Sequence, residues 1–189
     1  PIASSAASDV YKRQGLNVSH FNLISSVKGF ENWLSNLDAV YVGGGNTKFM
    51  LKYWKENNLI GLFKEVYNSG IILSGVSAGA ACWFDCFLTD SDGPGFKSMN
   101  GIGLLTGSFT PHYSDSKRAE KYRENIKNKT LPDGIAVDDG VAVLFIDGKP
   151  TEVYSSRKGH NAYFVNQNKQ FNLIAVSYTH LRAHETMSN

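Results

Sequence analysis

The sequence predicts an α/β fold, with a mostly parallel sheet between two layers of helices and a β-hairpin near the C-terminal end. Strand-like and helix-like patterns alternate from residue 15 to about residue 138. Two short aliphatic runs, residues 39–42 and 71–74, each lead into a glycine-rich turn, as strands do before a helix. Farther along the chain, Asp147-Gly148 is a hairpin turn signal between two strand-like runs. Alternating strands and helices imply a three-layer α/β/α sandwich.

The first part of the chain alternates between the two patterns. Residues 16–23 alternate polar and apolar side chains and predict the first strand, and residues 30–36 predict a short amphipathic helix. Asn46 is expected to cap the helix that follows the strand 39–42, with an aromatic stripe as its core face. Residues 59–67 carry apolar side chains at helical spacing, so they predict another helix with a clear core face.

The second part of the chain is expected to hold more strands. Directly after the strand 71–74 we expect a helix that carries Cys82 and Cys86 on one face. Residues 89–99 are polar, contain Gly and Pro, and predict a loop. Residues 117–129 predict a helix whose basic residues form a solvated face. The remaining strands are expected at residues 104–110, 141–146, 151–154, 161–165 and 171–174.

The composition is that of a soluble globular protein and excludes several function classes. The chain has 189 residues, of which 42% are hydrophobic and 19% charged, and this length favours one domain. A net charge of +2 is too small to indicate a nucleic-acid partner or an anionic membrane. No apolar run approaches the ~20 residues of a membrane span, and the two cysteines lack the further ligands of a metal site. We expect a cytoplasmic protein without metal or cofactor, and leave open whether it forms a homodimer.

Both ends of the chain differ in character from the middle. Residues 1–14 are rich in Ser and Ala without periodicity, and residues 176–189 carry His180, Arg182, His184 and Glu185 in a short polar tail. Both segments resemble translated adapter sequence, so we expect them to be foreign and place a single domain at residues 15–175. On this interpretation the native piece starts within a protein and lacks the strand and helix with which such a domain normally opens.

The most informative motif is Gly-x-Ser-x-Gly over residues 75–79, after the strand 71–74 and before a run of small residues. Strand, sharp turn and helix are the context of a nucleophile elbow, which lifts the hydroxyl of its central residue, here Ser77, off the end of the sheet. Such an elbow needs Gly75 and Gly79, because a Cβ at either position would crowd the turn. The alternative is a plain glycine-rich turn with an exposed serine.

A serine nucleophile needs a base within hydrogen-bond reach, and the base needs an acid that orients it. His112 is the best candidate base, because it comes just past the end of a predicted strand, while His20 and His160 are weaker candidates. Asp139 is the preferred acid and Asp138 the alternative. Asp-Gly is also common turn chemistry, so a purely structural role for this segment stays open.

The segment Gly43-Gly44-Gly45-Asn46 has two interpretations. Glycine-rich loops before helices cradle phosphates, but this one lacks the Lys-Ser/Thr pair of a P-loop. We prefer the second interpretation, in which the N–H of Gly44 or Gly45 pairs with the N–H of Ala78 as an oxyanion hole. Asn46, at the end of the segment, is a candidate substrate-binding residue.

Four motifs occur in order with plausible gaps: YVGGGNT at residues 41–47, GVSAGA at 75–80, TPHY at 110–113 and VDDG at 137–140. Together they resemble the peptidase E family of serine peptidases, relatives of cyanophycinase, over essentially all of residues 15–175. The resemblance implies a fold similar to that of class I glutamine amidotransferases, which is flavodoxin-like.

The resemblance also implies an activity, namely the hydrolysis of peptide bonds in small peptides, with dipeptides that begin with aspartate as the suggested substrates. The family's nucleophile falls on Ser77 and its base on His112, while its oxyanion donors fall near Gly44 and on Ala78. Its acid, often a glutamate, falls on the segment that holds Asp138 and Asp139, so Asp139 would be a shorter substitute.

Two further residues complete the candidate site. Asp92 matches another aspartate of the family, which we interpret as shaping the site, with a role as the acid kept as an alternative. Arg157 is a candidate for binding a substrate carboxylate, although an ordinary surface position is the commoner fate of an arginine. Two other functions stay open. The protein could be a non-catalytic module that binds a small ligand in the same crevice, or an esterase that uses Ser77 and His112.

Overall fold

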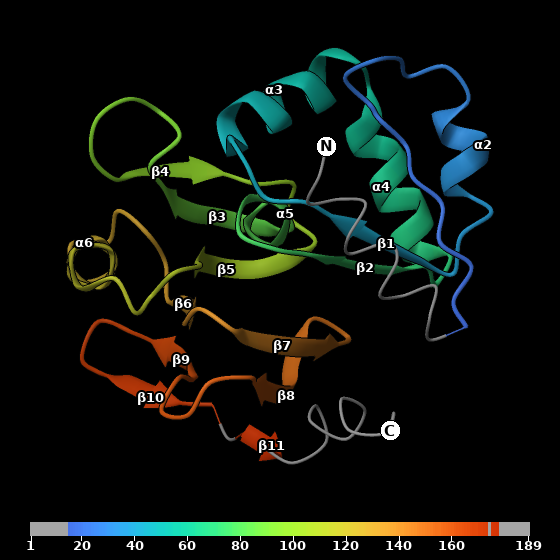
Figure 1. Ribbon diagram of the computed structural model, residues 1–189. Helices are drawn as coiled ribbons and strands as arrows, with labels where there is room; N and C mark the ends of the chain where they lie inside the picture. Colours follow the sequence, from blue (N-terminus) through green and yellow to red (C-terminus); the bar gives the residue numbers. More distant parts are fainter. Residues whose placement is uncertain (1–14, 174, 178–189) are drawn as a thin grey trace, which may run out of the picture. The chain divides into compact units, whose positions relative to one another are not determined.

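The computed structural model of the protein describes residues 15–173 and 175–177 (Figure 1). The chain divides into two compact units between Asp38 and Ala39. Residues 1–14 and 178–189, which include most of the segments expected to be foreign, lie outside the described residues. Val176 and Ser177 belong to the strand β11, Ala175–Ser177. The single domain at residues 15–175 stays a prediction.

Within its described residues, 15–38, the first unit contains one short helix, α2 (Phe30–Leu34), close to the predicted position. The strand predicted at residues 16–23 is wrong, because these residues form irregular structure ending in a turn. Alternation alone does not make a strand, which needs a hydrogen-bonded neighbour, and the described part of this unit, residues 15–38, contains none. Phe21 belongs to an aromatic cluster instead, and its ring centroid lies 5.1 Å from that of Phe30 and 5.3 Å from that of Trp33.

The second unit begins with a parallel pair of strands. β1 (Ala39–Val42) and β2 (Ile72–Gly75) pair in register and are connected through α3 (Thr47–Glu56) and α4 (Leu59–Asn68). Asn46 caps α3 as predicted, since its side-chain oxygen accepts a 2.8 Å hydrogen bond from the Phe49 N–H. Both strands therefore deliver their carboxyl ends, and the loops that follow them, to the same edge.

A six-stranded sheet follows, in the order β10-β9-β6-β5-β3-β4. Its central pairs, β3–β5 and β5–β6, are parallel, whereas β4, β9 and β10 are antiparallel to their neighbours. The sheet is thus mixed rather than mostly parallel, because hairpin connections add its edge strands. The six strands are β3 Phe84–Thr89, β4 Lys97–Asn100, β5 Leu105–Thr110, β6 Gly134–Val137, β9 Ala162–Val165 and β10 Gln170–Asn172.

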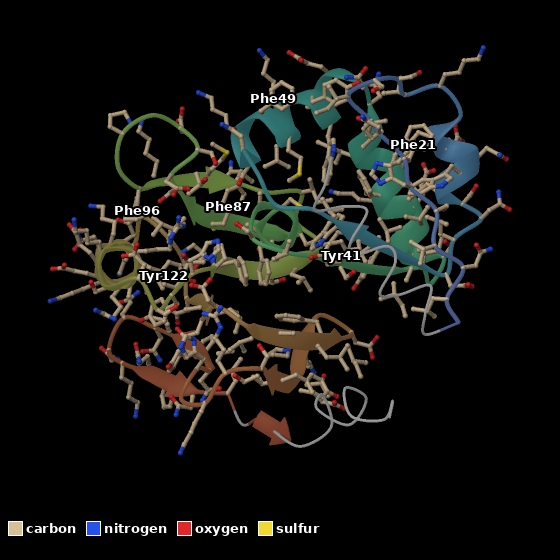
Figure 2. All side chains as sticks on the ribbon, viewed as in Figure 1. Phe21, Tyr41, Phe49, Phe87, Phe96 and Tyr122 are labelled. Carbon is tan, nitrogen blue, oxygen red and sulfur yellow. The ribbon has the colours of Figure 1, made fainter. Side chains whose placement is uncertain are left out.

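Two hydrophobic clusters pack on opposite faces of this sheet, because neighbouring strand residues point to opposite sides. One face carries Phe87 and is covered by the hairpin of β7 (Val141–Ile146) and β8 (Lys149–Ser155). The other face carries Leu88 and is covered by α6 (Ser116–Lys127), which contributes the fully buried Tyr122 (Figure 2). The core therefore combines a helix layer on one face with a β-hairpin on the other.

The hairpin forms as predicted. Asp147 and Gly148 both have positive φ, 51° and 73°, which is the backbone of the tight turns that join twisted antiparallel strands. β11 then pairs parallel to β8. Among the described elements of the chain, no helix has the length and apolar character required to cross a membrane.

Two predicted elements near the centre of the chain form but are shorter than predicted. The helix after the Gly-x-Ser-x-Gly turn, α5 (Ala78–Ala81), ends after a single turn, so Cys82 and Cys86 do not share a helical face. Cys86 lies on β3, because the aromatic residues around it pack into the sheet core and override helix formation. The loop predicted at residues 89–99 ends before β4, which begins at Lys97. Sheet pairing is again the cause, because β4 pairs with β3 and places Met99 opposite Phe87.

Candidate active site

The turn around Ser77 has the strained backbone of a nucleophile elbow. Ser77 has φ 54° and ψ −113°, between the end of β2 and the start of α5, in a region that costs a non-glycine residue ~1–3 kcal/mol. A Cβ on Gly79 would lie 2.1 Å from the Val42 carbonyl oxygen, and one on Gly75 would lie 2.2 Å from the Gly79 carbonyl oxygen. Both glycines are therefore required by close backbone packing, as the motif predicted.

His112 reaches the elbow from the end of β5. Its backbone also has positive φ, 55°, and its carbonyl accepts a 3.0 Å hydrogen bond from the Asp115 N–H, which closes a tight turn. The neighbouring Tyr113 N–H donates to the Val137 carbonyl at 3.0 Å, which ties this turn to β6. The result places His112 Nε2 at 2.9 Å from Ser77 Oγ, within hydrogen-bond distance.

Asp139 lies on the other side of the imidazole. Its Oδ1 is 2.5 Å from His112 Nδ1, so a proton on Nδ1 is donated to the carboxylate and Nε2 is free to accept from the Ser77 hydroxyl. The hydrogen bond with His112 is the main cause that holds the pKa of the Asp139 carboxyl below its usual value, and the charge of His112, a hydrogen bond from Ser114 and the charge of Arg157 add to it. Asp139 is therefore ionised at neutral pH.

The other candidate acids have other partners. Asp138 is buried, and its Oδ2 accepts hydrogen bonds from the Asn161 N–H at 2.9 Å and the Tyr163 hydroxyl at 3.2 Å. Asp92 forms ion pairs with Lys48 and, at 3.9 Å, with Lys97. Of the three predicted acids, Asp139 is the one that contacts His112.

The expected oxyanion donors lie around Ser77. A Cβ on Gly44 would be 3.3 Å from Ser77 Cβ and 3.9 Å from Ser77 Oγ, so this backbone passes directly beside the hydroxyl. Gly45 and Ala78 line a pocket of about 240 Å³ together with Ser77 and His112. Ala78 is the first residue of α5, where helix N–H groups lack intrahelical acceptors.

The same pocket contains a residue that the sequence analysis missed. Arg118 lines it and is only 5% exposed. Its Nη1 donates to the Leu88 carbonyl at 3.3 Å, its Nη2 lies 3.0 Å from Asp90 Oδ2, and the guanidinium stacks over the Phe96 ring at 4.6 Å. One signal was present in the sequence, because Arg118 is four residues before Tyr122 and so lies on the core face of its helix.

The three predicted substrate-binding residues lie outside the lining of this pocket as the described residues form it. The side chain of Asn46 caps α3, and Asp92 is paired with Lys48, which ties its loop to the start of α3. The stem of Arg157 lies against Gly140, where a Cβ would meet its Cγ at 3.1 Å. Arg157 therefore lies beside the loop of Asp139 and contributes positive charge there.

The geometry defines a class of protein in which a serine, a histidine and an aspartate lie at the ends of strands and are connected by hydrogen bonds. Residues 4–153 match the model of Peptidase family S51, and the chain belongs to this family. The expected resemblance to peptidase E is confirmed. The match starts within residues 1–14, whose foreign origin stays a prediction.

Individual relatives support the assignment. The chain is 44% identical over 135 residues to "Uncharacterized peptidase YgaJ" of Bacillus subtilis. The aligned region covers 71% of this chain but only 58% of that protein. The chain is 27% identical over 154 residues to "Peptidase E" of Haemophilus influenzae, covering 77% of this chain and 70% of that one. Over 177 residues it is 24% identical to "Peptidase E" of a Nostoc species, and the aligned region covers 84% of this chain and 73% of that protein.

Proposed function

We propose that the protein is a serine-type peptidase that hydrolyses peptide bonds in small peptides. The observation that carries this proposal is the run of contacts from Ser77 Oγ to His112 Nε2 at 2.9 Å and from His112 Nδ1 to Asp139 Oδ1 at 2.5 Å. Membership of Peptidase family S51 supports the hydrolysis of peptide bonds. The three-layer, class I amidotransferase-like architecture, the cytoplasmic location and the absence of a nucleic-acid or membrane partner are parts of the same proposal.

The reaction follows from the positions of these groups. Ser77 Oγ attacks the scissile carbonyl while His112 Nε2 takes its proton, and Asp139 stabilises the imidazolium. The N–H groups of Gly44 and Ala78 stabilise the oxyanion of the tetrahedral intermediate. His112 then returns the proton to the leaving amine, and a water molecule, deprotonated by the same imidazole, hydrolyses the acyl group from Ser77.

A covalent label tests this proposal directly. A fluorophosphonate reagent should phosphonylate Ser77 in the folded protein, and mass spectrometry of the digested protein should find the added mass on the peptide that contains this residue. Heat-denatured protein is the control and should take no label, because the base is no longer in place. A folded protein that takes no label would indicate a module that binds a small ligand. Turnover of esters without turnover of amides would indicate an esterase.

The pocket also suggests a substrate, and we propose dipeptides with an N-terminal aspartate. Arg118 brings a nearly buried positive charge to the pocket that contains Ser77. Its contacts with Leu88 and Asp90 leave further N–H groups of the guanidinium fork for a ligand. A carboxylate side chain next to the scissile bond would form charge-assisted hydrogen bonds with these groups.

Replacement of Arg118 by glutamine is expected to remove this preference. The ratio of kcat/KM for Asp-Leu to that for Asn-Leu should fall by about 10- to 100-fold, the value of a hydrogen bond to a charged group. Lys127→Gln is the matched control, since it removes an exposed cation from the last turn of the same helix. If Arg118→Gln folds and retains the ratio, another group selects the substrate.

A further inference from the structure

Ser114 makes two hydrogen bonds with Asp139, one in each direction. Its Oγ donates to Asp139 Oδ2 at 3.2 Å and accepts from the Asp139 N–H at 3.4 Å. The carboxylate is therefore held at both oxygens, with His112 on Oδ1 and Ser114 on Oδ2. A hydroxyl whose lone pair is fixed by a backbone N–H presents its proton in a defined direction.

Local folding brings Ser114 to this position. Ser114 lies two residues after His112, inside the turn closed by the hydrogen bond from the Asp115 N–H to the His112 carbonyl. The same turn is tied to β6 through Tyr113 and Val137. The base and the residue that contacts its acid therefore belong to one short loop, and they approach Asp139 together.

Packing alone does not hold Asp139. Its side chain is 43% exposed, as is that of His112. The residue after it, Gly140, has φ 78°, so the loop depends on a backbone conformation that few residues adopt. A carboxylate in such surroundings rotates unless hydrogen bonds fix its plane, and a rotated carboxylate no longer directs Nε2 of the histidine toward the serine.

We propose that Ser114 is a positioning residue that fixes the plane of the Asp139 carboxylate for its contact with His112. The inference rests on the proposed function, because it assigns Ser114 a part in the same hydrolysis. Ser114 does not touch the reacting atoms. It acts through Asp139, and its contribution depends on the carboxylate being present.

The variant Ser114→Ala is expected to lower kcat by about tenfold, the cost of one charge-assisted hydrogen bond, with KM unchanged. Ser114→Thr retains the hydroxyl and should restore most of the rate. Ser156→Ala is a matched control, because Ser156 is another exposed serine that donates to the same loop, but to the backbone carbonyl of Gly140 at 2.9 Å. This control should stay within about twofold of the unmodified protein.

A double-mutant cycle with Asp139→Ala separates positioning from a general effect on structure. In the Asp139→Ala background, the additional change Ser114→Ala should lower kcat by less than about twofold. If the two substitutions acted independently, their effects on kcat would multiply. Full multiplication, or an unchanged kcat in Ser114→Ala, would overturn the inference while leaving the serine-peptidase proposal intact.

A second readout does not depend on turnover. The Ser114 hydrogen bond lowers the pKa of Asp139, so NMR titration of the Asp139 carboxyl carbon should find a higher pKa in Ser114→Ala and no change in Ser156→Ala. An unchanged pKa of Asp139 would also overturn the inference. If the unmodified protein has no hydrolase activity, the proposed function fails, and the titration still shows whether Ser114 holds the carboxylate.

Discussion

Replacement of Ser77 by alanine is expected to reduce peptide hydrolysis by about four to six orders of magnitude, because the nucleophile is lost. The fold should survive the change. The Ser77 hydroxyl is directed at His112 Nε2, 2.9 Å away, so its removal does not leave a cavity in either hydrophobic cluster. Alanine also tolerates the strained backbone about as poorly as serine, so the cost of the turn hardly changes.

The measurement is kcat/KM on Asp-Leu, beside a thermal melt of each variant. Ser74→Ala is the matched control, since Ser74 lies three residues earlier on β2 and its hydroxyl donates to the Val40 carbonyl at 2.8 Å. That variant should lose some stability and keep its activity within a few-fold. Turnover near that of the unmodified protein by folded Ser77→Ala would contradict the mechanism.

The candidate site could be predicted from sequence where its residues follow local rules. Gly-x-Ser-x-Gly after a strand predicts an elbow because the steric requirement lies within a few residues, and the structure has this backbone at Ser77. His112 and Asp139 each come just after a strand, and strand ends converge at one edge of a sheet. The sequence alone does not decide between Asp139 and Asp138, because the choice depends on which of these two adjacent side chains turns away from His112. Asp138 turns to Asn161 and Tyr163.

The parts that were missed depend on contacts between segments distant in sequence. Residues 16–23 have a strand pattern, but the described part of their unit, residues 15–38, contains no strand with which they could pair. Cys86 has a helical spacing from Cys82, but the pairing of β3 with β4 and β5 takes that segment into a sheet. The sequence pattern places Arg118 among the cations of a solvated helix, and its burial depends on Leu88, near the end of β3, and on Asp90 and Phe96 from the loop between β3 and β4.

Replacement of Gly79 by alanine is expected to destabilise the protein by about 3 kcal/mol or more, above the usual cost of overpacking. The added Cβ would lie 2.1 Å from the Val42 carbonyl oxygen, 2.6 Å from its carbonyl carbon and 2.7 Å from the Gly43 carbonyl oxygen. All three are backbone atoms, so no side chain can move aside. Either β1 or the elbow must shift, and the Val76 N–H would lose its 3.1 Å hydrogen bond to the Val42 carbonyl.

Gly61→Ala is the control, and it should change stability in the opposite direction. Gly61 lies within α4, and a Cβ there would meet no atom within 4 Å among the described residues. Alanine in a helix interior is favoured over glycine by about 0.5–1 kcal/mol. Urea unfolding of both variants beside the unmodified protein measures the two effects. A free energy of unfolding that falls in Gly79→Ala and rises in Gly61→Ala would show that the elbow glycine is required by the packing of the backbone, and equal changes in the two variants would contradict this explanation.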